Sequence, residues 1–329
     1  MKPAVLITGA TGFLGKHLVG QLRTRGERGL RLLCRGRSSY DNQPDIEIVH
    51  GDVTDSAAVD RAIAGVGSVY HLAGIVSRDP HDRDKLFDVH VNGTRHVCDA
   101  ALRHGVERLV IVSSSGTIAV TREPVIHGEA AGFQHETTRR WGYYASKIAA
   151  EEEVLALCRT KSLPAAIVNP ALLLGPGDER CSSTGDIVHL FEGQIMTYPT
   201  GGMSFVDVRD AAAGTIAAME RGRIGECYLL GGVNWTFKRI IQETCGIAGL
   251  KPPLMSSPTW LVRLSAPLLR TLMPLLGRKF TLDDETIEMS GYFWYCDSTK
   301  AARELGFQAR DPLETLRDTV EDLRARGAI

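Results

Sequence analysis

The apolar positions in the first third of the chain form short continuous runs, separated by segments with a helical period. The runs have the length of strands and lie at residues 5–8, 30–34, 46–50, 68–74 and 108–112. Helical spacing is clearest from residue 16 onward and over residues 82–103. Continuous apolar strands that alternate with helices are typical of a parallel sheet with both faces covered. The pattern therefore predicts an α/β fold with a doubly wound parallel sheet, whose ligands bind at the carboxyl ends of the strands.

Three glycines connect the first predicted strand to the first predicted helix. Gly9, Gly12 and Gly15 stand at three-residue spacing, directly before the helical pattern. Glycine there lets the chain turn tightly and lets its backbone approach a pyrophosphate, while the helix N-terminus offers N–H groups to that anion. In this context the glycines indicate a Rossmann-type dinucleotide site, with an ordinary strand-to-helix turn as the alternative. The predicted contacts are Gly9, Thr11, Gly12, Phe13, Leu14 and Gly15.

The residue that follows the second predicted strand bears on which dinucleotide binds. An acidic residue about 20 positions beyond the fingerprint would hydrogen-bond the adenosine ribose and favour NAD. Arg35 stands 20 positions beyond Gly15, and its guanidinium would pair with a 2′-phosphate. The sequence therefore predicts NADP as the cofactor. NAD is the alternative, if Arg35 is only a surface residue and Asp41 binds the ribose.

Further cofactor contacts are expected where the third and fourth strands end. Asp52 could accept a hydrogen bond from the adenine amino group, although Thr54 or Asp55 could simply cap the next helix. The fourth strand ends in small residues, where a bulky side chain would block the cofactor. The predicted contacts at these two strand ends are Asp52, Val53, Ala73 and Gly74.

Composition and charge exclude several other classes of protein. The chain has 329 residues and a net charge of −1, so charge gives no argument for nucleic-acid binding. Its seven cysteines contain no Cys-x-x-Cys pair, which favours reduced thiols in a cytoplasmic protein and neither a disulfide framework nor a metal site. Residues 1–3 lead straight into a strand, so we expect no signal peptide. No apolar run reaches the ~18 residues of a transmembrane segment.

A tyrosine and a lysine on a predicted helix offer candidate catalytic chemistry. Tyr143 and Lys147 are four residues apart and share one helix face, and Tyr144 is three residues from the same lysine. A free tyrosine has a pKa of about 10, and a neighbouring ammonium lowers this pKa by stabilising the phenolate. The spacing suits proton transfer, although an isolated tyrosine–lysine pair on a helix more often lies on the surface and has no catalytic role.

These motifs occur, with others, in the order of a known family. Besides the glycine turn and the pair at 143 and 147, the matching stretches are 71–73, 92–94, 113–115, 169–170, 175–177, 205–210 and 297–307. The chain thus resembles the extended short-chain dehydrogenases/reductases of the NAD(P)-dependent epimerase/dehydratase superfamily over nearly its whole length. Within that family it is similar to the branch of dihydroflavonol reductases, 3β-hydroxysteroid dehydrogenases and hopanoid-associated epimerase-like proteins.

The resemblance implies a catalytic role for three residues. Ser115 would hydrogen-bond the substrate carbonyl, with Ser114 as the alternative because adjacent serines leave the register open by one residue. Tyr143 would donate or remove the proton. Lys147 would hold the nicotinamide ribose and tune the tyrosine, so that both would also contact the cofactor.

Two further positions match landmarks of the family. Pro170 would border the nicotinamide. Asn92 resembles the family's helix asparagine. It could equally be a polar group that ties a bent helix to backbone.

The second half of the chain predicts a smaller domain. Beyond residue 175 the pattern changes to loops and short helices, apart from a helix with small apolar residues at 206–222 and a strand at 227–232. In the family this pair returns to the cofactor domain. The resemblance therefore implies an NADP-binding Rossmann domain of residues 1–174 plus 205–233. A smaller, mostly helical C-terminal substrate-binding domain would comprise residues 175–204 plus 234–329.

Residues 260–276 are unusually apolar for this half of the chain. Four cations lie in or just after the stretch: Arg263, Arg270, Arg278 and Lys279. The stretch could be a core helix kinked at Pro267, a lid over an apolar substrate or a patch that contacts a membrane surface. Buried helices are the common outcome, so a core helix is the favoured prediction.

Three functions fit these motifs. We favour an NADP-linked oxidoreductase that interconverts a ketone and a secondary alcohol on a largely hydrophobic small molecule. A nucleotide-sugar epimerase or dehydratase would use the same site, and a non-catalytic NADP-binding regulatory protein is disfavoured by the intact serine, tyrosine and lysine. The resemblance places Met203 where sugar-nucleotide enzymes usually carry an arginine that binds the diphosphate. A desolvated diphosphate needs such a cation, although Arg180 or Arg209 could replace it.

A homodimer is also expected from the resemblance. Helices around 82–103 and 143–157 contain alanine and leucine and could pair into a four-helix interface about a twofold axis. The expected partners are therefore a small-molecule substrate and a second copy of the chain.

Overall fold

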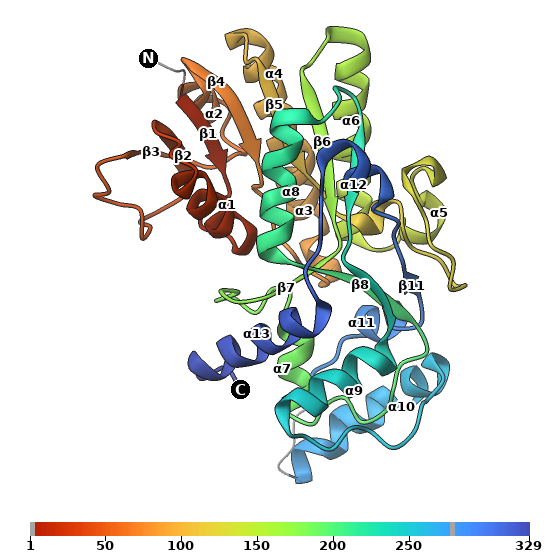
Figure 1. Ribbon diagram of the computed structural model, residues 1–329. Helices are drawn as coiled ribbons and strands as arrows, with labels where there is room; N and C mark the ends of the chain where they lie inside the picture. The colour runs from red at the N-terminus through yellow and green to blue at the C-terminus, as the bar shows by residue number, and fades with distance from the viewer. Residues whose placement is uncertain (1–3, 277–279) are drawn as a thin grey trace.

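Seven parallel strands form one sheet, drawn in the upper part of Figure 1, and the computed structural model describes residues 4–276 and 280–329. The strands are β1 Ala4–Thr8, β2 Leu30–Cys34, β3 Ile46–His50, β4 Val66–His71, β5 Arg108–Val112, β6 Ala165–Pro170 and β9 Cys227–Leu230. Their order is β3-β2-β1-β4-β5-β6-β9. The order reverses between β1 and β4, which is where a doubly wound sheet opens a crevice for a ligand.

Helices cover both faces of this sheet, and each layer encloses its own apolar core. The helices are α1 Phe13–Thr24 and α8 Val208–Arg221 on one face, and α2 Ser56–Ile63, α4 Gly93–His104 and α6 Gly142–Lys161 on the other. Successive residues of β4 alternate between the two cores, with Tyr70 in the first and Val69 in the second. The prediction of a doubly wound α/β sheet is therefore confirmed.

The helix predicted over 82–103 is interrupted. It consists of α3 Arg83–Phe87, a π-helical turn Asp88–Asn92, and α4. A π-helical turn inserts an extra residue per turn and so shifts which side chains face inward. In this turn His90 is buried.

The helix predicted over 206–222 begins later than expected. Residues 202–207 form strand β8 Gly202–Asp207, and the helix starts only at residue 208. Asp207 sets this boundary, because its carboxylate accepts a hydrogen bond from the Arg209 amide at 2.8 Å and caps the helix. The strand predicted over 227–232 is present as β9 and ends at Leu230.

A second, smaller sheet lies in the lower part of Figure 1 among most of the remaining helices. In this sheet β8 pairs in parallel with β7 and β11 and antiparallel with β10. The strands are β7 Leu172–Leu174, β10 Val233–Thr236 and β11 Phe293–Trp294, and the helices are α5 His135–Thr138, α7 Gly185–Phe191, α9 Phe237–Ala248, α10 Thr259–Leu272, α11 Asp284–Met289, α12 Thr299–Leu305 and α13 Pro312–Ala325. The C-terminal region is therefore mostly helical, as predicted, with a small mixed sheet in addition.

Two elements lie across the predicted division of the chain. Helix α12 packs beside α8 on the seven-stranded sheet, and its Ala301 and Leu305 belong to the same apolar core as α1. Strand β8, by contrast, belongs to the second sheet although its second half, residues 205–207, was expected in the cofactor domain. The division into 1–174 plus 205–233 and 175–204 plus 234–329 stays a prediction.

Residues 260–276 do not form a core helix, so the favoured prediction for them is wrong. They lie in α10, which contains Pro267, and in the 3₁₀ turn that follows it. Only one side of the stretch is covered, where Ala266 and Met273 are buried in a small cluster of their own. Large apolar side chains on the other side are exposed, among them Trp260 and Leu264.

Some observations apply to the described part of the chain only. Among residues 4–276 and 280–329, no helix is long and apolar enough to cross a membrane. In the same ranges no three His, Cys, Asp or Glu side chains are grouped so that they could hold a metal ion. All seven cysteines are free thiols. The predictions for residues 1–3, Arg278 and Lys279 fall outside the described residues.

The glycine turn owes its shape to two close approaches of backbone. Gly9 has a φ of +72°, and a Cβ there would lie 2.7 Å from the Ala73 nitrogen beyond β4. A Cβ at Gly15 would overlap the Gly9 carbonyl oxygen and lie 2.8 Å from the Ala10 Cα. The turn therefore needs glycine at both positions.

A matched pair of alanine substitutions on α1 tests this requirement. We expect Gly15→Ala to lower the free energy of unfolding by about 1–3 kcal/mol, because backbone must move to accept the methyl group. Gly20→Ala on the same helix should raise it by about 0.5–1 kcal/mol, because Gly20 is exposed and its added Cβ would have no atom within 4 Å. Urea unfolding of the two variants measures both effects, and shifts of the same sign would contradict this explanation.

Candidate active site

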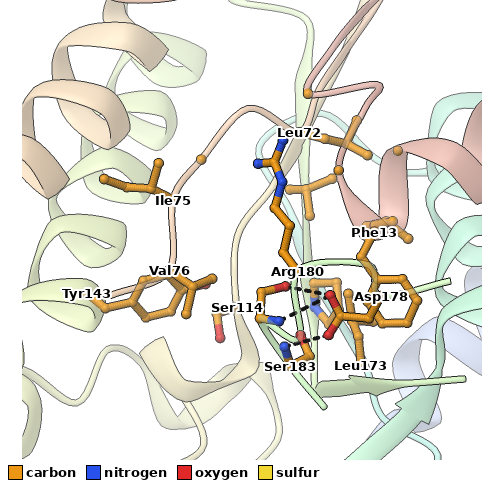
Figure 2. Close-up of a pocket in the computed structure, with 18 of the residues that line it drawn as sticks. Phe13, Leu72, Ile75, Val76, Ser114, Tyr143, Leu173, Asp178, Arg180 and Ser183 are labelled. Atoms are coloured by element: carbon orange, nitrogen blue, oxygen red, sulfur yellow. Dashed lines mark hydrogen bonds between the residues drawn. The ribbon is translucent and has the colours of Figure 1, made fainter. Parts of the chain in front are cut away.

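A cavity of about 960 Å³ lies at the carboxyl ends of the parallel strands. Segments that follow β1, β2, β4, β5 and β6 line it on one side, and residues of the smaller part of the molecule line it on the other. Figure 2 shows its middle region, with side chains from both sides pointing inward. Among the predicted site residues, those that line it beyond the glycine turn are Arg35, Gly74, Ser115, Tyr143, Lys147 and Pro170.

The glycine turn lines one end of the cavity with all its predicted contacts. These residues are Gly9, Thr11, Gly12, Phe13, Leu14 and Gly15. Helix α1 starts here without a side-chain cap at Gly12 and without an acidic residue in its first turn. Its first N–H groups therefore have no competing anion from the helix itself. The glycine turn leaves space beside the helix N-terminus that side chains at Gly9, Gly12 and Gly15 would otherwise take. This space and the free N–H groups fit a dinucleotide pyrophosphate.

Cations line the cavity beyond β2. Arg35 and Arg37 both contribute, together with Ser38 and Ser39. The Arg35 side chain is 61% exposed, and its Nε lies 3.8 Å from a carboxylate oxygen of Asp52. An exposed arginine with so distant a partner is able to contact a phosphate.

Three predicted cofactor contacts do not line the cavity. Asp52 uses its other carboxylate oxygen to accept hydrogen bonds from the amide and hydroxyl of Thr54 at 3.0 and 3.1 Å. Val53 is buried in the core beneath α4. Ala73 donates its amide to the Thr8 hydroxyl at 3.1 Å. These residues hold the strand ends in place, and packing of this kind leaves no signal in the spacing of sequence motifs.

Asp41, the alternative ribose ligand, does not line the cavity either. Its carboxylate accepts hydrogen bonds from the amide and the hydroxyl of Ser38 at 3.3 and 3.0 Å. This pair closes the loop that follows β2.

Helix α6 brings Tyr143 and Lys147 together at the inner end of the cavity. The Lys147 ammonium is buried and donates a hydrogen bond to the Val112 carbonyl at 3.1 Å. Burial lowers the pKa of Lys147 to about 8, although the charge of Glu151 acts in the opposite direction. Desolvation raises the pKa of Tyr143 to about 12, against the effect of the Ser114 hydroxyl beside it. The tyrosine is therefore protonated at neutral pH and able to donate a proton.

The three serines after β5 have different surroundings. Ser113 is turned inward, and its hydroxyl donates a hydrogen bond to Glu151. The Ser114 hydroxyl faces Tyr143, as Figure 2 shows. Ser115 is buried at the start of a 3₁₀ turn. The placement thus favours Ser114, the alternative, over Ser115, because the Ser114 hydroxyl is the one that lies beside Tyr143.

Glu151 connects helix α6 to the ends of β5 and β6. It is buried and accepts hydrogen bonds from Ser113 and from the Asn169 side chain, the latter at 2.9 Å. Burial raises its pKa, and the hydrogen bonds and Lys147 oppose that rise. This residue could have been found from the sequence, because Glu151 lies four positions beyond Lys147 on the same helix face.

His90 is a site residue that the sequence analysis missed. Its Nε2 accepts a hydrogen bond from the Ile75 amide at 3.2 Å, so its proton is on Nδ1. Nδ1 then donates to the Ser146 hydroxyl at 2.8 Å, which in turn donates to the Tyr143 carbonyl at 2.8 Å. Burial, together with the Lys147 charge, lowers the pKa of His90 well below its usual value. A neutral histidine therefore positions the helix turn that carries Tyr143.

Asn92 does not take part in this network. Its amide donates to Asp88 at 2.9 Å and its carbonyl oxygen accepts from Arg95 at 3.0 Å, both on the outside of the helix. Neither the catalytic nor the backbone-tying interpretation of Asn92 matches these contacts. The π-helical turn explains the difference, because it turns residue 90 inward and residue 92 outward.

One wall of the far end of the cavity is apolar and aromatic, and the charged side chains of Arg78, Asp186 and Glu285 line the same end. Tyr144, Met203, Met289 and Trp294 form the apolar wall and belong to, or pack against, one buried cluster. The rings of Tyr144 and Trp294 have centroids 4.9 Å apart. No residue of α10 lines the cavity, so the structure gives no support to the lid interpretation of that helix.

Two arginines also reach the cavity. Arg78 pairs with Asp186 at 3.4 Å. Arg180 extends into the middle of the cavity in Figure 2, and no acidic partner lies within ion-pair distance among the described residues. Arg209 is held instead by Asp207 at 2.6 Å and by a second carboxylate, away from the cavity. Arg180 and Arg209 were the two residues proposed to replace the arginine that is missing at Met203. Of these two, only Arg180 lines the cavity and could pair with a diphosphate there.

A dinucleotide cradle and a buried tyrosine–lysine pair on a doubly wound sheet define an NAD(P)-dependent enzyme of the short-chain dehydrogenase/reductase type. The chain belongs to the NAD dependent epimerase/dehydratase family, whose model matches residues 5–231. It is 33% identical to sterol demethylase protein B of Methylococcus capsulatus, over 98% of this chain and 99% of that protein. It is 32% identical to a putative dihydroflavonol 4-reductase of a Synechocystis species, over 100% and 97%. These relatives agree with the branch that the motifs indicate.

Solved structures show the same fold. The crystal structure of gox2253 matches with a TM-score of 0.84 and 32% identity over the full length of both chains. A dTDP-glucose 4,6-dehydratase of Streptomyces venezuelae, solved with NAD bound, matches with a TM-score of 0.76 and 22% identity over 98% of each chain. A sugar-nucleotide dehydratase thus shares the fold, and the chain itself is an oxidoreductase of the NAD dependent epimerase/dehydratase family.

The depressed pKa of Lys147 predicts how stability depends on pH. Between about pH 8 and 10.5 Lys147 keeps its proton in the unfolded chain and has lost it in the folded chain, so the free energy of unfolding rises with pH in this range. Burial of the ammonium therefore destabilises the fold fully below about pH 8, and this destabilisation disappears toward pH 10.5. That shift corresponds to ~3 kcal/mol. We expect Lys147→Met to raise the free energy of unfolding at pH 7 by about 2 kcal/mol, after a loss of about 1 kcal/mol for the bond to Val112. Near pH 10.5 the gain should disappear.

Urea unfolding at pH 7 and near pH 10.5 measures this difference. The control is Lys161→Met, an exposed lysine at the end of the same helix, which should change stability by less than about 0.5 kcal/mol at either pH. A Lys147→Met variant that is less stable than the parent at pH 7 would show that the ammonium contributes net stability.

Proposed function

We propose that this enzyme uses NADPH or NADP to interconvert a ketone and a secondary alcohol on a largely apolar small molecule. The observation that carries the proposal is the apolar wall of Tyr144, Met203, Met289 and Trp294 at the end of the cavity that also holds Tyr143. Such a wall favours a substrate whose affinity comes from buried apolar area, at about 25 cal/mol per Å². The resemblance adds that Met203 stands where sugar-nucleotide enzymes carry a cation.

The proposed chemistry divides between two hydroxyls and an ammonium. Ser114 would hold the substrate oxygen by a hydrogen bond, in place of Ser115. Tyr143, protonated at neutral pH, would donate a proton to that oxygen in reduction and accept it back in oxidation. Lys147 would stabilise the tyrosinate that forms. The bound cofactor supplies or accepts the hydride.

The second candidate function is a nucleotide-sugar epimerase or dehydratase. Arg180 favours it, because this side chain extends into the cavity where a substrate diphosphate could pair with it. The same arginine could pair with the cofactor pyrophosphate, in which case it says nothing about the substrate. A regulatory protein without catalysis has no comparable support, because the serine, tyrosine and lysine are all present.

A substrate panel separates these functions. NADPH oxidation is followed with steroid, flavonoid-like and long-chain ketones, and UDP-sugars are assayed in parallel for epimerisation without added reductant. We expect turnover of an apolar ketone, strongly reduced in Tyr143→Phe because the transferable proton is removed, with cofactor binding nearly unchanged. Tyr144→Phe is the matched control and should have a much smaller effect. Ser114→Ala should lower kcat by about 100-fold or more, and Ser115→Ala by much less.

Two outcomes of this panel would contradict the proposal. Turnover of a sugar nucleotide would mean that the apolar wall and Met203 do not select the substrate. A larger loss in Tyr144→Phe or Ser115→Ala than in Tyr143→Phe or Ser114→Ala would mean that the catalytic register is wrong.

We also propose that Arg35 makes NADP the preferred cofactor. A charge-assisted hydrogen bond to the 2′-phosphate contributes ~1.5–3 kcal/mol, or roughly 10- to 150-fold in affinity. Arg35→Ala should lose that factor for NADPH and leave the affinity for NADH unchanged. Arg28→Ala, an exposed arginine that does not line the cavity, is the control. Equal affinities of the parent enzyme for NADPH and NADH would contradict the proposal.

The homodimer stays a prediction that rests on the family resemblance. Its predicted interface is formed by the helices around 82–103, which are α3 and α4, and by residues 143–157 of α6. Light scattering at micromolar concentration should give twice the chain mass, and a monomer would reject the prediction.

A further inference from the structure

Six large apolar side chains of α10 and of the 3₁₀ turn after it are turned to solvent, and we define the six together as the outer face of α10. Their exposed fractions are 67% for Trp260, 44% for Leu261, 73% for Leu264, 60% for Leu268, 44% for Leu272 and 79% for Leu275. Isolated exposed leucines are ordinary in proteins, but a contiguous apolar surface of this kind marks an interaction site.

Five of the six side chains share one side of α10 because of the helix period, and Leu275 follows in the 3₁₀ turn. At about 100° per residue, positions 260, 261, 264, 268 and 272 fall within about 120° of the circumference of α10. Ala266 and Met273 lie on the opposite side and are buried. The helix thus packs on the protein through one apolar side and presents a second, wider one outward. A broad apolar stripe with a tryptophan at one end is typical of helices that lie in a membrane interface.

The cavity does not use this surface. Helix α10 lies at the end of the molecule opposite the seven-stranded sheet in Figure 1, and none of its residues lines the cavity. The outer face is therefore independent of the proposed function, and a partner can cover it without closing the site.

The charges around the outer face select the kind of partner. No aspartate or glutamate occurs between Glu243 and Asp283, whereas this segment contains five lysines and arginines. Among its described cations, Arg270 is paired with Asp284 at 2.7 Å. Arg263 and Lys251 are exposed and have no acidic partner within ion-pair distance in the described ranges. An apolar stripe beside unpaired cations is complementary to a bilayer that contains anionic lipids.

We propose that the outer face of α10 docks on the surface of such a bilayer. A second copy of the chain fits less well, because a twofold interface is self-complementary, and residues 244–282 of the other copy contain no aspartate or glutamate to pair with Arg263. An anionic bilayer instead supplies both the apolar layer for the leucines and the negative charge for Arg263. The leucine side chains would enter the boundary between headgroups and acyl chains, with the helix in the plane of the surface.

Vesicle binding tests the proposal with a reporter that the chain already contains. Trp141, Trp235 and Trp294 are 1%, 5% and 1% exposed, so a change of tryptophan emission on mixing with vesicles reports on Trp260. We expect co-sedimentation with phosphatidylcholine vesicles that contain about 30% phosphatidylglycerol, and a blue shift of the emission. Binding to pure phosphatidylcholine, or at high salt, should be clearly weaker because the charge attraction is absent or screened.

Variants that keep the reporter identify the surface. Leu264→Ser combined with Leu268→Ser should lower vesicle binding by about tenfold or more, because two inserted side chains are lost. Arg263→Gln should weaken binding to the anionic vesicles and leave binding to neutral ones unchanged. Val125→Ser combined with Ile126→Ser is the matched control, since both residues are exposed apolar positions elsewhere on the chain, at 49% and 55%. Unchanged NADPH affinity and thermal midpoint verify that every variant is folded.

Three results would overturn the proposal. The first is a parent protein that does not bind the anionic vesicles. The second is a Leu264 and Leu268 double variant that binds them as well as the parent does. The third is a dimer of the parent that dissociates in this double variant while neither protein binds vesicles, which would show that a second copy covers the outer face.

Discussion

The candidate site depends on an ammonium that is held away from water. Burial of Lys147 favours the neutral amine, and Glu151, one helical turn further along α6, favours the charged form. The balance sets the pKa of the lysine at about 8, and the Val112 carbonyl fixes where the ammonium lies. Ser113 and Asn169 donate hydrogen bonds to the Glu151 carboxylate at the ends of β5 and β6, and these bonds favour its charged form against the effect of burial. The ends of these two strands are therefore linked to helix α6 through hydrogen bonds of Lys147 and Glu151.

The cavity joins two chemically different halves. At the glycine turn it is formed by backbone and by cations such as Arg35, which suits a charged dinucleotide. At the other end one wall is formed by aromatic and thioether side chains, with Tyr144 and Trp294 in contact, and Arg78, Asp186 and Glu285 also line this end. Tyr143 lies between the two halves. This position suits a group that transfers a proton at the point where a polar cofactor meets an apolar substrate.

Much of the fold was predictable from the sequence, because strand-length apolar runs, the glycine turn and the spacing of Tyr143 and Lys147 are all local patterns. The π-helical turn at residues 88–92 has no such pattern, so His90 was missed and Asn92 was misplaced. The register between Ser114 and Ser115 depends on where the chain leaves β5, which is decided by packing. The prediction of a core helix for α10 was wrong for a related reason. The apolar pattern of a helix is the same in sequence whether the helix is covered by the protein core or exposes its apolar side chains.

Transfer of an isotope tests the central claim most directly. With NADPH that carries deuterium on the reactive face of its nicotinamide, a reductase delivers that label to the carbonyl carbon of the ketone. The account predicts an alcohol with one deuterium on its carbinol carbon, and one NADP released for each alcohol formed. The contradicting result is a sugar nucleotide converted in many turnovers with no net oxidation of NADPH, which is the behaviour of an enzyme that re-reduces its own substrate.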